Sequence, residues 1–253
     1  MGPEIRFEHV SRRFGPVTAV ESVDLAIAAG GFVALAGESG SGKSTLLRAI
    51  NRLDANATRE GRVTIGGVDA SAGPVTALRR RIGYVFQSIG LFPHIDVAAN
   101  IGIGRRARGE TLSSAEIAAL LEQVGLSADF ARRMPRELSG GQAQRVGIAR
   151  ALAIEPEILL LDEPFAALDP VTRDALGKTV RALHEARGLT TILVTHDMAE
   201  AMLLADRVIV MARGRIVADA SPEELASGRG GAEAEALVAV PREQARRIAG
   251  LAK

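Results

Sequence analysis

The stretch Gly37-Glu-Ser-Gly-Ser-Gly-Lys-Ser-Thr45 decides the fold of this chain of 253 residues. Its G-x-x-x-x-G-K-S spacing is that of a phosphate-binding loop. The apolar run Phe32–Ala36 precedes it, and a helical segment, Ser44–Leu53, follows it. Glycines allow backbone N–H groups to curl around phosphate oxygens, and the positive N-terminus of the helix points at the same charge. The stretch therefore predicts a strand, a nucleotide cradle and a helix in direct succession.

Two side chains of this cradle have separate predicted roles. The Lys43 ammonium would reach the β- and γ-phosphates of a nucleotide, and the Ser44 hydroxyl would ligate Mg²⁺. The alternative, a glycine-rich turn without a ligand, is disfavoured because the strand, loop and helix signals agree. The cradle residues that we expect to contact the nucleotide are Gly37, Glu38, Ser39, Gly40, Ser41, Gly42, Lys43, Ser44 and Thr45.

A second apolar strand, Ile158–Leu161, ends in the carboxylates of Asp162 and Glu163. Because side chains alternate in direction along a strand, the two carboxylates point different ways. We expect Asp162 to hold the Mg²⁺ shell and Glu163 to act as general base or to position water. Taken alone, the pair could be solvated acids at a strand end. His196 also ends an apolar strand, where a lone histidine is usually structural. Because the chain also contains the cradle motif, we expect His196 to contact the γ-phosphate.

Leu138-Ser-Gly-Gly-Gln142 precedes a long helical stretch, Ala143–Ile154. Ser139 is a good N-cap, and Gln142, three residues later, completes the spacing of a capping box. The small residues leave the positive end of this helix open to an anion. Since the cradle already holds one nucleotide, a second phosphate-binding helix end implies a second subunit.

The remaining pattern predicts an α/β protein. Alternating apolar and polar residues in Glu4–Val10, Val23–Ile27 and Arg62–Val68 predict an antiparallel sheet near the N-terminus. Helical stretches separate a second set of short apolar runs, which predicts a parallel sheet covered by helices. The runs expected as buried parallel strands are Phe32–Ala36, Ile82–Phe86, Ile158–Leu161, Thr191–Val194 and Val208–Met211.

Composition argues against several classes of protein. The chain has 31 basic and 30 acidic residues, and a net charge of +1 argues against a nucleic-acid partner. It has no cysteine, which excludes disulfides and thiolate chemistry. No run approaches the roughly 18–20 consecutive apolar residues that cross a bilayer, and the N-terminus does not look like a secretion signal. A role at a membrane would require docking through a partner.

Together the motifs resemble an ATP-binding cassette (ABC) ATPase over about residues 4–225. The motifs stand in the order typical of the family: the cradle, Gln87 at the end of Tyr84-Val-Phe-Gln87, residues 138–142, residues 158–163, Ala167-Leu-Asp169 and His196. The resemblance implies a P-loop NTPase fold with a RecA-like parallel-sheet core, an N-terminal antiparallel β subdomain and an α-helical subdomain. It also implies ATP and Mg²⁺ as cofactors, with ATP sandwiched between two cassettes.

The resemblance assigns further roles. Gln87 would touch Mg²⁺ or the attacking water, Asp169 would lie at the dimer interface, and Phe14 would stack on adenine where the family often has tyrosine. Expected nucleotide contacts beyond the cradle are Phe14, Ser139, Gly140, Gly141, Gln142 and Asp169; expected metal ligands are Ser44, Gln87 and Asp162; expected catalytic residues are Glu163, His196 and Gln87. We expect an ABC domain over residues 4–231, with a helical insertion at about 90–137, and a partly helical tail over 232–253.

The branch of the family remains open between several possibilities. No coiled coil splits the cassette and no membrane domain is fused to it, which favours a bacterial importer. Gln87–Asn100 either covers a local core or forms part of a groove for the permease. Four stretches are similar to importers of osmoprotectants or quaternary amines such as glycine betaine, choline or proline: Ile89–His94, Met134–Gly141, Leu168–Arg173 and Thr195–Ala201. Alternatives are an amino-acid or sulfonate importer, an exporter, and a soluble ABC ATPase that acts on nucleic acid.

The importer interpretation predicts a set of partners. They are a second, identical cassette, transmembrane permease subunits, and a periplasmic or lipid-anchored solute-binding protein, without nucleic acid. The chain would then work at the cytoplasmic face of the cell membrane, as a peripheral subunit.

Overall fold

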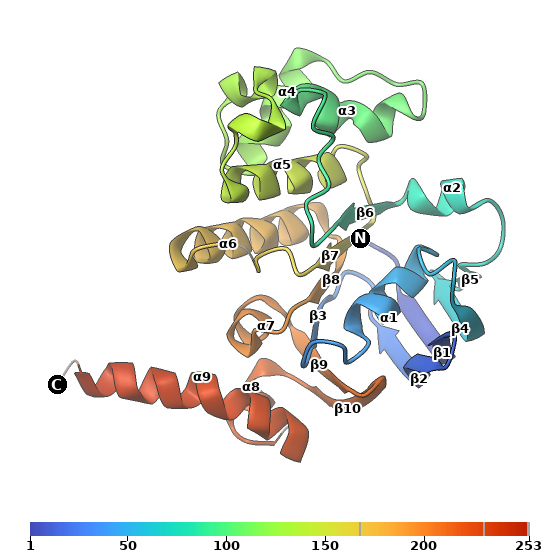
Figure 1. The fold of residues 1–253 in the computed structure, drawn as a ribbon, viewed down its shortest axis with the longest axis vertical. Coiled ribbons are helices and arrows are strands. Elements are labelled where there is room, and N and C mark those ends of the chain that lie inside the picture. The colour runs from blue at the N-terminus through green and yellow to red at the C-terminus, as the bar shows by residue number, and fades with distance from the viewer. Residues whose placement is uncertain (167, 230, 252–253) are drawn as a thin grey trace. The chain divides into compact units, whose positions relative to one another are not determined.

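The computed structural model describes residues 1–166, 168–229 and 231–251 (Figure 1). Ala167, the first residue of the Ala167-Leu-Asp169 motif, lies outside the described residues, as do Gly230 and residues 252–253. The chain forms two compact units. Unit 1 comprises Met1–Pro3 and Gly73–Thr191, and unit 2 comprises Glu4–Ala72 and Ile192–Lys253.

Unit 2 contains an antiparallel sheet with the strand order β2-β1-β4-β5. Its strands are β1 (Ile5–Phe14), β2 (Val17–Ile27), β4 (Thr58–Ile65) and β5 (Val68–Asp69). Ile5 stands opposite Ile27 on one side and Ile65 on the other, and all three side chains are buried. The predicted antiparallel sheet is confirmed. β1 and β2 extend beyond the predicted runs because irregular pairing near Arg12 carries the ladder on to Phe14.

The second sheet begins in unit 2 with β3 (Phe32–Ala36), which is buried at every residue. β3 pairs in parallel with β9 (Arg207–Ala212), and β9 pairs antiparallel with β10 (Arg215–Ala220). β10 was not predicted. It follows a tight turn in which Arg213 and Gly214 both have positive φ, and its partly exposed residues lack the apolar run that marks the buried strands. The helices of unit 2 are α1 (Lys43–Ile50), α7 (Met198–Leu204), α8 (Pro222–Ala226) and α9 (Ala232–Leu251).

Unit 1 contains the parallel pair β6 (Ile82–Val85) and β7 (Ile158–Asp162), with Ile82 opposite Ile158. β8 (Thr190–Val194) begins in unit 1 and ends in unit 2. The parallel strands predicted from the short apolar runs are therefore present. The helices of unit 1 are α2 (Val75–Arg79), α3 (Val97–Arg106), α4 (Ser114–Gln123), α5 (Gly140–Leu152) and α6 (Pro170–Arg187), with short 3₁₀ turns η1 (Ala128–Arg132) and η2 (Pro135–Glu137).

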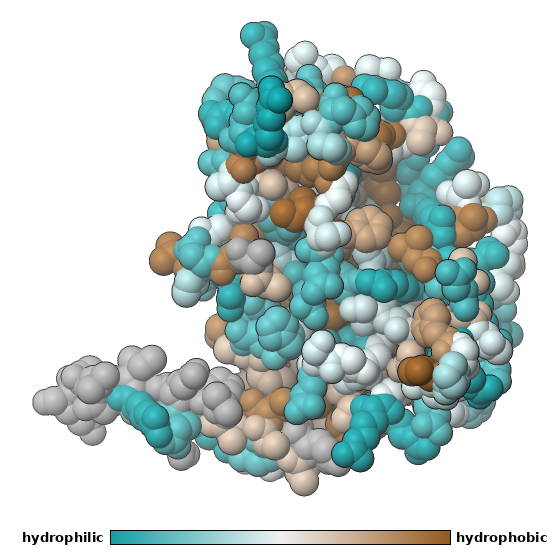
Figure 2. Space-filling model, viewed as in Figure 1, coloured by the Kyte–Doolittle hydropathy of each residue, from teal (hydrophilic) through white to brown (hydrophobic). Residues whose placement is uncertain are grey.

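The helices α3, α4 and α5 pack against one another in unit 1. Side-chain caps set where they begin: Asp96 accepts from the Ala99 N–H at 2.8 Å, and Ser113 forms a capping box with Glu116. The Ser113 cap explains why α4 starts at Ser114. Figure 2 shows mainly hydrophilic residues on the visible outer face of this helical region. None of the helices in the described part of the chain has the length and apolar character that crossing a bilayer requires.

The close approach of β6 to α5 depends on Gly83. A Cβ at this position would lie 2.7 Å from the carbonyl oxygen of Ala151 and 3.1 Å from Cγ of Pro156. The strand and the helix that precedes β7 therefore meet backbone to backbone.

We predict that Gly83→Ala lowers the free energy of unfolding by about 1–3 kcal/mol, because the added methyl group overpacks this contact. Gly102→Ala is the matched control, since no atom lies within 4 Å of a Cβ there. In the interior of α3 the control should raise stability by about 0.5–1 kcal/mol. Urea unfolding of the two variants measures both values, and equal stability of the two would contradict the packing argument.

Candidate nucleotide-binding and catalytic site

The phosphate cradle lies in unit 2, between β3 and α1. Gly37, Gly40 and Gly42 have φ values of 140°, 80° and 103°, which side chains rarely permit. A Cβ would lie 2.2 Å from the Met211 carbonyl oxygen at Gly37, and 2.3 Å from the Ala19 carbonyl oxygen at Gly42. The loop is thus wrapped tightly against β2 and β9. Gly37 and Gly42 are required by space as well as by conformation, and Gly40 by conformation alone.

Lys43 is only 4% exposed, and its ammonium group bonds within the loop. Nζ donates to the carbonyl oxygens of Gly37 at 2.8 Å and Glu38 at 2.7 Å, and lies 3.4 Å from Oγ of Ser41. α1 begins at Lys43, and its N-cap Gly42 supplies no side-chain cap. A cationic group and a helix N-terminus thus meet in one glycine loop, which fits the phosphate groups of a nucleotide.

Phe14 ends β1 in the same unit and is 38% exposed. The following strand, β2, carries Ala19, whose carbonyl oxygen lies against Gly42 of the cradle. The hairpin that presents the Phe14 ring is therefore in contact with the loop that would hold the phosphates.

Unit 1 brings Gln87, Asp162 and Glu163 to the carboxyl ends of β6 and β7. Asp162 is fully buried and accepts a hydrogen bond from the Tyr84 hydroxyl at 2.9 Å. Glu163 accepts one from the Gln87 side-chain amide at 3.1 Å. Sequence reasoning missed Tyr84, although it is the single tyrosine of the chain and stands two residues before Phe86 and three before Gln87.

Glu163 has a backbone conformation that its sequence did not reveal. Its φ is 47°, in the left-handed region that non-glycine residues rarely adopt. Such conformations cost on the order of 1–3 kcal/mol and persist where the surrounding structure enforces them. This residue directly follows the buried Asp162, where β7 ends.

The helix α5 begins as predicted, at a capping box. The Gln142 N–H donates to Oγ of Ser139 at 3.3 Å, and the Ser139 N–H donates to the Gln142 side chain at 3.0 Å. A Cβ at Gly140 would meet no atom within 4 Å, so the space beside Gly140 is open. A Cβ at Gly141 would lie 2.9 Å from Cγ2 of Thr172, so this turn adjoins the start of α6.

Asp169 is the N-cap of α6 and lies in the same unit. It accepts from the N–H groups of Val171 at 3.1 Å and Thr172 at 3.0 Å. Hydrogen bonds from the Thr172 side chain and from backbone N–H groups lower the pKa of the Asp169 carboxyl, so it is ionised at neutral pH.

His196 is exposed and lies in unit 2, between β8 and α7. Its neighbour Thr195 is buried and donates to Glu200 at 2.6 Å, and Asp197 caps α7. His184 has a different environment: it is buried in α6, with Nδ1 3.0 Å from Oγ1 of Thr191. The predicted residues thus fall into two groups, with Phe14, the cradle and His196 in unit 2 and the others in unit 1.

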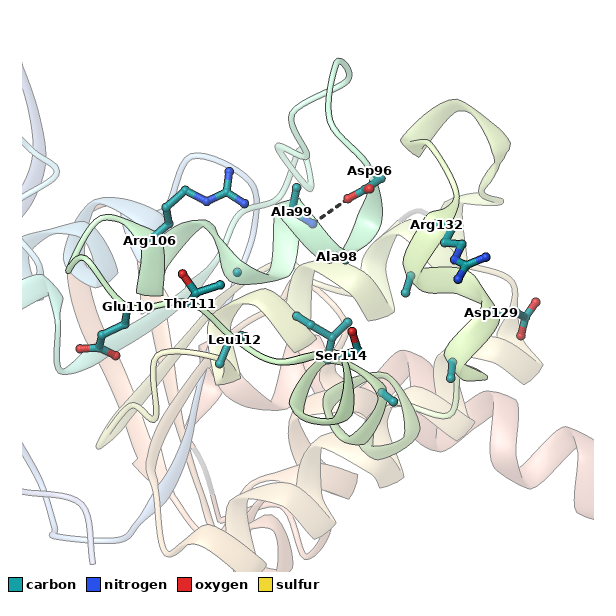
Figure 3. Close-up of a pocket in the computed structure, with 15 residues that line it drawn as sticks. Asp96, Ala98, Ala99, Arg106, Glu110, Thr111, Leu112, Ser114, Asp129 and Arg132 are labelled. Carbon is teal, nitrogen blue, oxygen red and sulfur yellow. Dashed lines mark hydrogen bonds between the residues drawn. The ribbon is translucent and has the colours of Figure 1, made fainter.

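A cavity of about 700 Å³ lies among α3, α4 and η1 in unit 1, and sequence reasoning did not predict it. Figure 3 shows charged side chains around it, among them Arg106, Glu110, Asp129 and Arg132. Alanine and leucine side chains, such as Ala98, Ala99 and Leu112, form much of the rest of its lining.

A profile of the ABC transporter family matches residues 20–166. The glycine betaine uptake system ATP-binding protein YehX of Escherichia coli is 46% identical over 220 residues, which cover 86% of this chain and 71% of that protein. The sulfate/thiosulfate import ATP-binding protein CysA of Thermosynechococcus vestitus is 48% identical over 223 residues, which cover 87% of this chain and 65% of the relative. The Fe(3+) ions import ATP-binding protein FbpC of Pseudomonas fluorescens is 48% identical over 219 residues, covering 85% and 61%. The chain thus spans less than two thirds of the last two relatives.

Solved structures give the same family. The dimeric, post-hydrolysis structure of the ATP-binding cassette MJ0796, bound to ADP and Pi, has a TM-score of 0.78 and 34% identity, covering 86% of this chain and 98% of that one. The profile matches more than half of the chain, and the structural neighbour shares the α/β architecture of two sheets with helices. The protein therefore belongs to the ABC transporter family, as an ATPase cassette.

Proposed function

We propose that this cassette energises a bacterial importer, and that its two groups of predicted residues perform ATP binding and hydrolysis. The observation that carries the proposal is the hydrogen bond between Gln87 and Glu163, which places an amide and a carboxylate beside the buried Asp162. The three relatives described above are each named as ATP-binding proteins of uptake or import systems.

ATP binding would use the cradle and the exposed aromatic ring. The Lys43 ammonium would exchange carbonyl partners for the β- and γ-phosphate oxygens, and the Phe14 ring would stack on adenine. The proposed Mg²⁺ ligands are Ser44, Asp162 and Gln87. A ligand set with one carboxylate suits Mg²⁺, because this ion also binds the phosphates of the substrate. Bound Mg²⁺ would neutralise charge on the β- and γ-phosphates.

Hydrolysis would depend on Glu163, Gln87 and His196. The Glu163 carboxylate would take a proton from the attacking water or orient it, while Gln87 holds that carboxylate by its amide. His196 would contact the γ-phosphate. The left-handed backbone at Glu163 supports this role, since strained residues cluster at active sites.

A second, identical cassette would complete each site. The helix N-terminus formed by Ser139, Gly140, Gly141 and Gln142 would bind the nucleotide of the other subunit, and the ionised Asp169 would lie at the interface. The similar MJ0796 cassette is described as dimeric. Within each subunit we propose an ABC domain at residues 4–231, a helical insertion at about 90–137, and a tail at 232–253 whose described part forms α9.

Transmembrane permease subunits are the proposed partners of the helical region. The cavity among α3, α4 and η1 offers small apolar side chains with charged residues around them, which suits a short segment of another protein (Figure 3). Its lining includes Asp96, which lies in the Gln87–Asn100 segment, and one of the two interpretations of that segment is a groove for the permease. The cassette would then be peripheral, at the cytoplasmic face of the inner membrane, in a complex that includes a solute-binding protein.

The proposed solute is an osmoprotectant or quaternary amine such as glycine betaine or choline. The E. coli relative, named for glycine betaine uptake, supports this class. Relatives named for sulfate/thiosulfate and Fe(3+) import have similar identity, so another polar-solute importer is the second candidate. The cassette would not contact the solute in either case, so the permease and the solute-binding protein would determine which solute is imported.

We predict that Glu163→Gln retains ATP binding but lowers the rate of hydrolysis by about 10²–10⁴-fold, because the amide cannot accept a proton. Lys43→Ala is the contrasting variant and should weaken ATP binding itself. Equilibrium nucleotide binding and steady-state phosphate release distinguish the two. Near-normal turnover by Glu163→Gln would refute the assigned base, and unchanged ATP affinity in Lys43→Ala would refute the cradle.

We predict that the chain co-purifies with a permease and a solute-binding protein from gently solubilised membranes. Calorimetry should show that the recovered solute-binding protein binds glycine betaine or choline, and sulfate should be tested as the alternative ligand. Binding of sulfate alone would replace the osmoprotectant proposal by the second candidate. Recovery of ribosomes or nucleic acid in place of a permease would refute the importer.

A further inference from the structure

Arg150, which has no role in the function proposed above, bonds to the loop that follows Gln87. Its guanidinium donates from Nη1 to the Gly90 carbonyl oxygen at 2.6 Å, and from Nη2 to the Ile89 carbonyl oxygen at 2.7 Å. Arg150 lies in the last turn of α5, the helix whose first turn contains Gly140 and Gly141. One helix therefore joins the proposed anion-binding turn to the Gln87 loop.

The turn that Arg150 holds is an unusual one. Ile89 and Gly90 have φ values of 50° and 61°, so two consecutive residues are left-handed. β-Branched residues such as isoleucine rarely adopt this conformation. A planar guanidinium presents N–H donors side by side, so its two terminal nitrogens can each bind one of two neighbouring carbonyl groups. The Arg150 fork thus stabilises a backbone turn that its own sequence disfavours.

Packing reinforces these hydrogen bonds. Gly147, one turn before Arg150, lies against the same loop, since a Cβ there would be 3.5 Å from Cγ2 of Ile89. On the other side of Gln87, Gly83 of β6 meets Ala151 of α5 backbone to backbone. The Arg150 side chain is half-buried, and this burial lowers the pKa of its guanidinium. The end of α5 therefore contacts the chain both before and after Gln87.

Gln87 completes the connection, because its amide donates to Glu163 at 3.1 Å. We propose that Arg150 is a positioning residue that couples the first turn of α5 to the Gln87–Glu163 pair. In a dimer, a nucleotide held by the partner cassette would press on the start of α5, and Arg150 would transmit this to the catalytic carboxylate of its own subunit. The inference rests on the proposed function, and it makes the two ATP sites cooperative through this helix.

The experiment compares Arg150→Met with Arg145→Met in the full chain. Arg145 is the matched control: it lies on the same helix and donates to a backbone carbonyl, that of Val124, at 2.7 Å, away from the Gln87 loop. The rate of ATP hydrolysis is measured against ATP concentration for both variants and the wild type. Hydrogen–deuterium exchange of the peptide spanning residues 86–92 reports the loop directly.

We expect Arg150→Met to lower kcat by about 10- to 100-fold, since small misplacements of catalytic groups have effects of this size. The half-saturating ATP concentration should change less than about twofold, because the cradle is untouched. Cooperativity in ATP should be lost, and exchange at residues 86–92 should rise. Arg145→Met should keep the kcat, the cooperativity and the loop exchange of the wild type, and Arg150→Lys should fall between the two methionine variants.

Equal loss of kcat in the two methionine variants would overturn the proposal, because the effect would then be a general loss of helix stability. So would unchanged loop exchange in Arg150→Met. Failure of the proposed function looks different: the wild type itself would then not hydrolyse ATP. The exchange measurement would still show whether Arg150 holds the loop.

Discussion

The bonds between the Lys43 ammonium and the carbonyl oxygens of its own loop are the interaction on which the cradle depends. A buried ammonium must be paired, since an unpaired buried charge is strongly unfavourable. Lys43 meets this need within the loop, and so the loop has its curled shape before a ligand arrives. A phosphate would replace carbonyl partners by stronger anionic ones without reordering the chain. Preorganisation of this kind raises affinity because less conformational freedom is lost on binding.

Arginine has a different use in this chain. Several guanidinium groups bind backbone carbonyls at the ends of helices or in turns: Arg105 binds Ala153, Arg145 binds Val124, and Arg187 binds Leu152. The planar fork can satisfy a carbonyl at a helix end while its remaining donors take a carboxylate, as Arg105 does with Glu110 and Glu155. These contacts tie the helices of unit 1 to the loops between them, so its order depends on polar clamps as well as on the apolar core.

Local patterns explain how much of this protein could be predicted. The strand before the cradle, the capping box formed by Ser139 and Gln142, and the order of the motifs all depend on residues close in sequence. The edge strand β10 could not be predicted from the sequence, because its residues are only partly buried. The bonds from Tyr84 to Asp162 and from Arg150 to Gly90 join residues far apart in sequence, which no local pattern reveals. The left-handed backbone at Glu163 could not be predicted either, because tertiary contacts impose this conformation against the preference of the residue.

That backbone at Glu163 has an evolutionary consequence. Glycine and asparagine adopt a left-handed conformation more readily than glutamate, so stability alone would favour either of them at this position. Neither of them supplies a carboxylate. With the catalytic role proposed for Glu163, a single substitution here would make the fold more stable and the protein inactive at the same time, in a copy of the gene released from the need to turn over nucleotide. The residue therefore records whether such a copy is still under selection for hydrolysis.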